Sequence, residues 1–206
     1  MKIDVMPLGH IAANCYMLLS NNAAVVIDPG IFSQKVEDFL NDNSEKDRLI
    51  LLTHAHFDHI CGADRLRKDT GVKIAVGEKD APALIDTKLS LSDKFHAHQP
   101  PFEADILLKD NAIFNVGDIE FKSISTPGHT VGGMCYLTGK TLFSGDTLFL
   151  ESVGRTDFPG GESQTLLKSI KRLLTLDEEI TVYPGHGEPT TVKHERIYNP
   201  FIRGDL

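Results

Sequence analysis

The chain has 206 residues, of which 41% are hydrophobic, and its 29 acidic and 21 basic side chains give a formal net charge of −8. This length suits one large domain, so we expect a single domain over residues 1–206. The acidic balance argues against a general nucleic-acid surface. An apolar run of about eighteen residues, as a membrane span requires, is absent from the sequence, so we expect no membrane segment.

The cysteines are few and scattered, at Cys15, Cys61 and Cys135, and none forms a C-x-x-C pair. A disulfide framework is therefore not expected, and a reducing cytoplasm is the simplest setting. The N-terminus carries an early Asp4 and Pro7 and lacks the apolar block of a signal peptide. We expect a cytoplasmic protein without nucleic-acid or membrane partners. Cys61 is interpreted as a small buried helix residue.

The first half of the chain alternates short strands and helices. Apolar stretches bounded by turn residues predict strands at 2–8, 14–19, 23–28, 49–53 and 72–76. The i, i+3, i+4 spacing of Val36, Phe39 and Leu40 predicts a helix capped by Ser33. A second helix should begin at Ile60 and end at Gly71, and a third, shorter one covers 78–85.

The second half is richer in strands. Strands are predicted at 106–108, 112–114, 119–125, 134–137, 141–143 and 180–183, with one helix at 163–174 and a partly helical tail from 188. Residues 87–104 are predicted to form an irregular loop over the active site. His96 and His98 in this loop stand at i, i+2, as metal ligands can, but no carboxylate accompanies them. A solvated role is favoured over ligation.

The segment from His54 to His59 packs three imidazoles and one carboxylate into six consecutive residues, directly after an apolar run. In an extended chain His54 and His56 face the same way and can bind one ion. Asp58 and His59 follow at the turn into the helix and project elsewhere, which favours two adjacent ions. Imidazole and carboxylate donors suit zinc, iron or manganese. The alternative is a polar loop whose histidines only form hydrogen bonds.

Three later loops supply what the first cluster lacks. His129 stands in Thr126–Thr130, Asp146 in Ser144–Thr147 and His186 in Pro184–Gly187, and each loop follows a predicted strand. Singly, each of these segments could be an ordinary turn. Together with the first cluster they place ligand-bearing loops on one edge of a sheet structure, as a buried pair of metal ions requires.

These motifs, in this order, resemble those of the metallo-β-lactamase superfamily, and more narrowly its glyoxalase II-like hydrolases. The matching stretches are Thr53–Gly62, Gly128–Gly132, Phe143–Phe149 and Pro184–Gly187. The resemblance implies an α+β fold, a four-layer αββα sandwich in which two sheets face each other, helices lie outside and the metals sit at one edge.

The resemblance also implies the roles of individual residues. It assigns His54, His56 and His129 to a first metal. A second metal is assigned to Asp58, His59 and His186, and Asp146 bridges the two. The cofactors are then two divalent ions, with zinc as the leading candidate and iron or manganese as alternatives. A metal-bridging hydroxide attacks a carbonyl, and Asp58 serves as the catalytic residue that holds this hydroxide.

The expected substrate is a small-molecule acyl thioester, such as the glutathione conjugate S-lactoylglutathione. Arg155, in the loop after Asp146, is the candidate to bind a substrate carboxylate, and its alternative is an ion pair with Asp157. Full-length glyoxalase II enzymes add a helical domain that supplies most glutathione contacts, and this chain resembles the short members. Three alternative functions are a persulfide dioxygenase with one iron, an RNA-processing or other phosphodiester hydrolase, and a non-catalytic metal-binding module.

Overall fold

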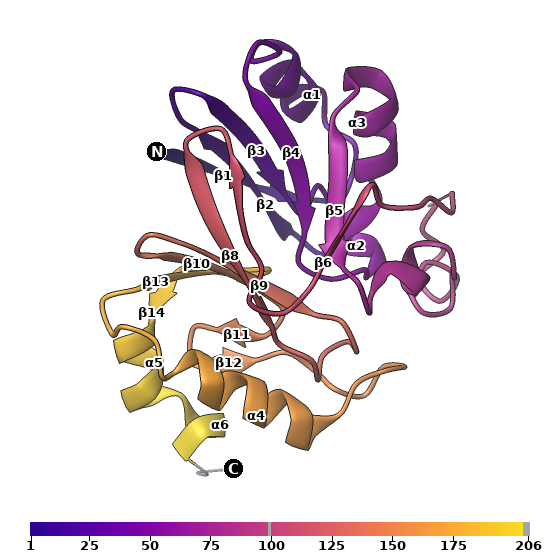
Figure 1. The fold of residues 1–206 in the computed structure, drawn as a ribbon. Coiled ribbons are helices and arrows are strands. Elements are labelled where there is room, and N and C mark those ends of the chain that lie inside the picture. Colours follow the sequence, from indigo (N-terminus) through magenta and orange to yellow (C-terminus); the bar gives the residue numbers. More distant parts are fainter. Residues whose placement is uncertain (99, 204–206) are drawn as a thin grey trace.

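The computed structural model describes residues 1–98 and 100–203, and two facing β-sheets form its centre (Figure 1). The first sheet has six strands in chain order: β1 (Lys2–Leu8), β2 (Ala13–Leu19), β3 (Ala23–Ile27), β4 (Asp47–Leu52), β5 (Lys73–Gly77) and β6 (Ile106–Leu108). Its first three strands pair antiparallel, and β3 to β6 run parallel.

The second sheet also has six strands, in the order β14-β13-β10-β9-β8-β7. Their bounds are β7 (Ile113–Val116), β8 (Ile119–Ser125), β9 (Met134–Thr138), β10 (Thr141–Gly145), β13 (Thr181–Pro184) and β14 (Thr190–Thr191). The pair β10 and β13 is parallel and the other pairs are antiparallel. A separate short ribbon joins β11 (Leu148–Phe149) to β12 (Ser152–Val153).

Helices cover the outer faces of both sheets (Figure 1). On the first sheet lie α1 (Gln34–Asn41) and α3 (Ala63–Thr70), with the one-turn α2 (Phe57–Ile60) between β4 and α3. On the second sheet lies α4 (Ser163–Leu173), followed near the C-terminus by α5 (Val192–Tyr198) and α6 (Pro200–Arg203). The α4 helix begins at Glu162, whose carboxylate accepts hydrogen bonds from two backbone N–H groups of the first turn.

Three apolar clusters separate these layers. Val36, Leu40 and Leu66 of the helices pack on the outer face of the first sheet. Aromatic and branched side chains, Phe121, Tyr136 and Phe143 of the second sheet among them, fill the space between the sheets. Leu166, Ile170 and Leu173 of α4 pack on the outer face of the second sheet. The order of layers is helix, sheet, sheet, helix, which confirms the α+β four-layer sandwich.

The continuous apolar runs of the central strands follow from this layering. Every residue of β3 is buried, as are the last four residues of β4, because helices cover one face of these strands and the second sheet covers the other. The strand β8 has a covered and a more open face, and its burial alternates accordingly. Within the described ranges, we find no helix long and apolar enough to cross a membrane.

One predicted helix is divided in the structure. The expected helix from Ile60 to Gly71 is interrupted between α2 and α3, at Cys61 and Gly62. The N–H of Gly62 donates to the carbonyl of Pro29 over 2.8 Å, which takes it out of the helical hydrogen-bond pattern, and a Cβ atom there would lie only 2.6 Å from that oxygen. The interpretation of Cys61 as a buried helix residue is wrong, because it follows α2 and is only half-buried.

Other differences are smaller. The predicted helix at 78–85 is a 3₁₀ turn at Ala81–Leu84 with a proline inside it, and the β11–β12 ribbon was not predicted. Residues 87–104 contain no strand or α-helix where they are described, as expected for an irregular loop. Residue 99 of that loop and residues 204–206 of the tail lie outside the described residues.

The apolar side chains between the sheets should contribute strongly to the free energy of unfolding, and a substitution of Phe121 tests this contribution. Its ring is fully buried and stacks on Phe114 with centroids 5.6 Å apart. Phe121→Ala should lower the free energy of unfolding by about 3–5 kcal/mol in urea titrations followed by circular dichroism. Ile113→Ala, at a position that is 66% exposed on the same sheet, should cost below about 1 kcal/mol. Equal losses in the two variants would contradict this assignment of the core.

Candidate metal centre

The loops that follow four strands meet at one edge of the sandwich. His54 and His56 follow β4, His129 follows β8, Asp146 follows β10, and His186 follows β13. Backbone hydrogen bonds join these loops across the two sheets. The N–H of Met134 donates to the carbonyl of Thr53 over 2.8 Å. Because parallel and neighbouring strands end together here, side chains far apart in the sequence become neighbours.

The donor atoms form two groups, as the sequence predicted. The ring nitrogens of His54, His56 and His129 lie within 4.8 Å of one another, and His56 Nδ1 is 2.9 Å from His129 Nε2. The donor atoms of Asp58, His59 and His186 form the second group at the same spacing. In that group His186 Nε2 lies 3.3 Å from Asp58 Oδ2 and 3.3 Å from His59 Nε2.

Asp146 lies between the two groups. Its Oδ2 atom is 3.5 Å from His129 Nε2 in the first group and 3.6 Å from His186 Nε2 in the second. Its Oδ1 atom is 3.4 Å from His59 Nε2. One carboxylate thus faces both groups, and all seven residues named as ligands in the sequence are brought together.

Hydrogen bonds on the outer side of three rings determine which nitrogen faces inward. Thr53 Oγ1 lies 3.1 Å from His54 Nδ1, and Asp28 Oδ2 lies 3.0 Å from His59 Nδ1. His129 Nδ1 donates to the carbonyl of Arg155 over 2.7 Å. These acceptors favour a proton on Nδ1 of each ring, which leaves Nε2 as the nitrogen that faces the centre, as in many metal-binding histidines.

Unpartnered atoms at the centre fit divalent cations. His54 Nε2, His56 Nε2 and Asp146 Oδ1 are buried and make no hydrogen bond to the described residues. Buried polar atoms are almost always partnered, and a cation would satisfy several of them together. The donors are imidazole nitrogens and carboxylate oxygens, a set that suits zinc, iron or manganese. The residues present therefore fit a metal centre.

The electrostatics of the two groups differ. Burial, with the neighbouring imidazoles, lowers the pKa of His56 to about 3 and holds the pKa of His54 well below its usual range, so both rings are neutral. Burial would lower the pKa of His59 as well, but the charges of Asp146 and Asp58 outweigh it and raise the pKa to about 10. The second group thus favours a positive charge, which a proton or a metal ion can supply.

Asp28 is a functional residue that sequence reasoning missed. It is 1% exposed, stands at a positive φ of 52° after β3, and was interpreted only as the end of a strand. Its Oδ1 atom accepts the Thr53 N–H over 2.7 Å, and its Oδ2 atom accepts the Thr53 hydroxyl over 2.6 Å and the His59 ring. Asp28 lies within reach of His54 and His59 as a donor, but these hydrogen bonds use its oxygens. It therefore orients His59.

Asp80 is a second missed residue, and it joins two ligand-bearing loops. It is 1% exposed. Its Oδ2 atom accepts the N–H of Ala55 over 3.1 Å and the hydroxyl of Thr130 over 2.8 Å, and its Oδ1 atom accepts the N–H of Gly132 over 2.7 Å. Ala55 lies between two ligand histidines and Thr130 follows a third. Nothing in the sequence indicated that Asp80, within the predicted helix at 78–85, would join these loops. Its hydrogen-bond partners become neighbours only through tertiary packing.

Three further candidate residues lie outside the donor groups. The guanidinium of Arg155 is exposed and makes two hydrogen bonds of 2.6 Å to the carboxylate of Asp157, so the structure shows the alternative ion pair. The backbone carbonyl of Arg155 still fixes His129. His96 and His98 are exposed and belong to neither donor group, which agrees with their predicted solvated role.

Comparison with known proteins places this centre in a family. The model of the metallo-beta-lactamase superfamily matches residues 8–186. A probable metallo-hydrolase of Bacillus subtilis, YqgX, is 36% identical over 208 residues, 99% of each chain. The hydroxyacylglutathione hydrolase GloC of Haemophilus influenzae is 30% identical over 210 residues, 98% of each chain.

Solved structures agree with the observed fold. The BLEG-1 B3 metallo-beta-lactamase superposes with a TM-score of 0.89 at 36% identity, over 98% of this chain and 99% of that one. TTHA1623, solved in a di-iron-bound form, gives a TM-score of 0.85 at 33% identity, over 96% and 99% of the two chains. With its seven converging donors at the edge of an αββα sandwich, this chain belongs to the metallo-β-lactamase superfamily of metal-dependent hydrolases.

Proposed function

We propose that this protein is a thioester hydrolase of the glyoxalase II type, acting on S-lactoylglutathione or a similar acyl thioester. The observation that carries the proposal is the pair of donor groups that share one carboxylate, Asp146. A pair of ions at such a site is suited to hydrolysis. The similarity to a hydroxyacylglutathione hydrolase over 98% of the chain supports the thioester as substrate.

The donor geometry supports a specific assignment of ligands. A first ion would be held by His54, His56 and His129, and a second by Asp58, His59 and His186, with Asp146 available to both. Zinc is the leading candidate, and iron is the alternative that the di-iron-bound form of TTHA1623 supports.

The chain's own residues explain why a thioester is suitable. Two divalent ions, when bound, would supply an activated water and polarise the carbonyl. Asp58 would accept a hydrogen bond from that water and so orient it. The hydroxyls beside the ligands are already engaged, since Thr53 donates to Asp28 and Thr147 donates to Thr126. A leaving thiolate needs no proton donor, because a thiol has a pKa of about 8.5, whereas an amide nitrogen does.

A β-lactam is the second candidate substrate, because the BLEG-1 β-lactamase is 36% identical and has a TM-score of 0.89. A persulfide dioxygenase with one iron is less well supported, since a single ion would leave one of the two donor groups without a cation.

The substrate class can be decided by a panel of assays on metal-loaded protein. The panel contains S-lactoylglutathione, nitrocefin, a phosphodiester and, with oxygen uptake recorded, glutathione persulfide. We expect the highest kcat/KM with S-lactoylglutathione. Oxygen consumption with the persulfide and no thioester cleavage would overturn the proposal in favour of the dioxygenase, and faster cleavage of nitrocefin would favour the β-lactamase.

The bridging role of Asp146 predicts a loss of both ions from one substitution. Asp146→Ala should lower the affinity for each ion by at least about tenfold and abolish thioester cleavage. Elemental analysis of protein purified without added metal measures the occupancy. Asp4→Ala, which removes an exposed carboxylate on β1, should retain the metal content of the native protein. An Asp146→Ala protein with two ions and near-native turnover would refute the assignment.

The close packing behind Asp146 gives an independent prediction. A Cβ atom at Gly185 would lie 2.1 Å from Asp146 Oδ1 and 2.8 Å from the His59 ring. Gly185→Ala should therefore displace the carboxylate and reduce metal affinity by about tenfold or more.

The matched control is Gly187→Ala. Gly187 has a φ of +76°, and a Cβ atom added there would meet no other atom within 4 Å. This variant should therefore lose about 1–2 kcal/mol of stability and keep its metal. Thermal unfolding and metal content measure the two effects. Equal metal loss in both variants would show that backbone strain, and not the contact with Asp146, is responsible.

A further inference from the structure

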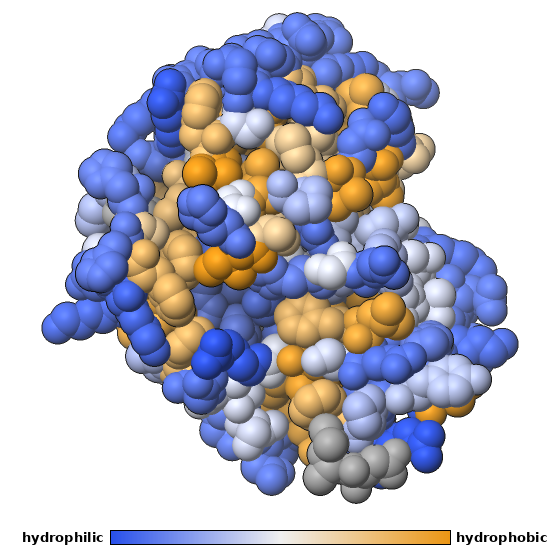
Figure 2. All heavy atoms as spheres, turned by 180° about the vertical axis from the view of Figure 1, so that it is seen from behind, coloured by the Kyte–Doolittle hydropathy of each residue, from blue (hydrophilic) through white to orange (hydrophobic). Residues whose placement is uncertain are grey.

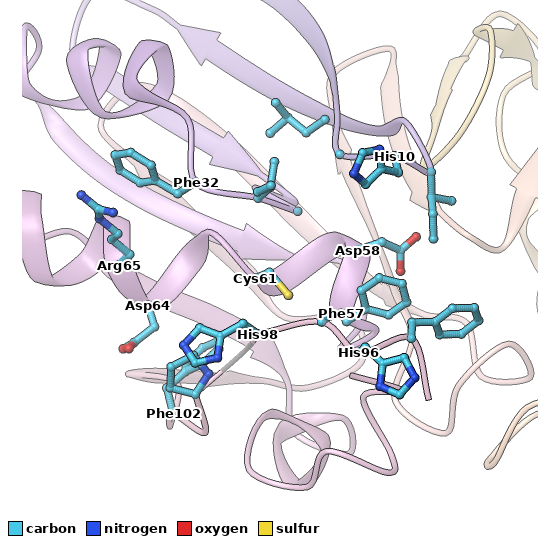
Figure 3. A pocket seen from close by; sticks show the side chains of 18 of the residues that line it. His10, Phe32, Phe57, Asp58, Cys61, Asp64, Arg65, His96, His98 and Phe102 are labelled. Atoms are coloured by element: carbon cyan, nitrogen blue, oxygen red, sulfur yellow. The ribbon is translucent and has the colours of Figure 1, made fainter. Parts of the chain in front are cut away.

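A large cavity adjoins the metal centre on the side of Asp58 (Figure 3). Its volume is about 930 Å³, and its walls come from residues 8–11, 30–32, the segment of α2 and α3, residues 95–98, Pro100 and Phe102. Cavities that bind small molecules measure roughly 300–1,000 Å³. Figure 2 shows apolar side chains grouped around a hollow on the face turned away in Figure 1. The cavity is large enough for a substantial part of a substrate.

Apolar side chains dominate its walls. They are Leu8, Ile11, Ile31, Phe32, Phe57 and Phe102. The sulfur of Cys61 also faces the interior and forms part of the wall (Figure 3).

The charged residues of the wall do not favour an anion. Lys68 pairs with Asp64 over 2.6 Å, and Arg65 pairs with Asp69 over 3.1 Å. Asp58 adds a further negative charge. Besides these paired groups, His10, His96 and His98 line the cavity as polar side chains. The apolar side chains that make up most of its surface suit an uncharged, apolar group.

Positive charge lies on the other side of the centre. Lys94 and Arg155 approach the ring of Phe158, at 4.4 Å and 4.0 Å from its centroid, and this ring is 6.1 Å from the ring of His56. Because Asp157 pairs with Arg155, Lys94 supplies the positive charge on this side. Phe95 separates this side from the cavity. Its ring stacks on Phe57 at 4.9 Å and meets Phe158 edge-on at 6.1 Å. The thiol part of the substrate, if it carries carboxylates as glutathione does, would be attracted to Lys94. The acyl group could then occupy the cavity on the other side.

We propose that the cavity beside Asp58 binds the acyl group of the substrate and selects aromatic acyl groups over small polar ones such as lactoyl. Asp58 belongs both to the cavity wall and to the second donor group. An acyl group whose carbonyl lies at the donor groups can therefore extend into the cavity. This inference rests on the proposed thioesterase function and specifies its substrate class.

The test compares S-mandeloylglutathione with S-lactoylglutathione, which differ only in a phenyl group in place of a methyl group. The native protein should show a kcat/KM ratio of at least about tenfold in favour of the mandeloyl ester. Cys61→Phe places a ring inside the cavity and should bring the ratio close to one. Val5→Phe enlarges a side chain that is 54% exposed and outside the cavity, and should keep the native ratio.

A second cavity variant guards against misfolding of the first, and a binding measurement gives a result that does not depend on ester cleavage. Ile31→Trp, at a position that is 46% exposed, replaces Cys61→Phe if that variant does not fold. Calorimetric titration of the metal-loaded protein should give about tenfold tighter binding of mandelate than of lactate, and the difference should disappear in the cavity variant.

The outcomes separate the two proposals. Cleavage of both esters at equal kcat/KM would overturn the role of the cavity and leave the thioesterase function standing. If neither ester is cleaved, the proposed function fails, and equal binding of mandelate and lactate would then also overturn the cavity proposal. A mandeloyl preference that persists in both cavity variants would likewise contradict it.

Discussion

The buried carboxylate of Asp28 is the interaction on which the metal centre depends. It ends β3, accepts two hydrogen bonds from Thr53 at the end of β4, and accepts a third from the ring of His59 on α2. A buried carboxylate is costly unless it is fully hydrogen-bonded, so these groups are held in one arrangement. The same contacts leave His59 Nε2 directed at Asp146. Asp80 acts in the same way on the loops of His56 and His129.

The two sheets contribute differently to the centre. The first sheet supplies consecutive ligands from a single loop after β4, supported by parallel strands on both sides. The second sheet supplies Asp146 and His186 from two parallel strands, β10 and β13, whose ends are joined by a hydrogen bond of 2.8 Å between Gly185 and Gly145. Donors from different strands can converge only because the apolar layer between the sheets holds both edges in register.

The surroundings of the centre divide by charge. Lys94 and Arg155 lie around Phe158 near the first donor group, and Asp157 pairs with Arg155, which leaves the charge of Lys94. The cavity beside Asp58 is largely apolar, and Arg65 and Lys68 in its wall are paired with carboxylates. The two sides of the centre therefore differ in charge.

The sequence by itself predicted the seven donor residues, and its resemblance to a known family predicted their grouping and the layer architecture. The cluster from His54 to His59 and the loops of His129, Asp146 and His186 carry their chemistry in residue type and local spacing. The continuous apolar runs of β3 and β4 likewise indicate strands covered on both faces. Tertiary structure alone decided the rest. Asp28 and Asp80 acquire their roles from partners 25 to 52 residues away, and the break after α2 arises from contact with the loop at Pro29. The pairing of Arg155 with Asp157 depends on side-chain conformation, which local sequence does not specify. These roles depend on which buried groups become neighbours in the folded chain, and the hydrophobic pattern of the sequence does not contain that information.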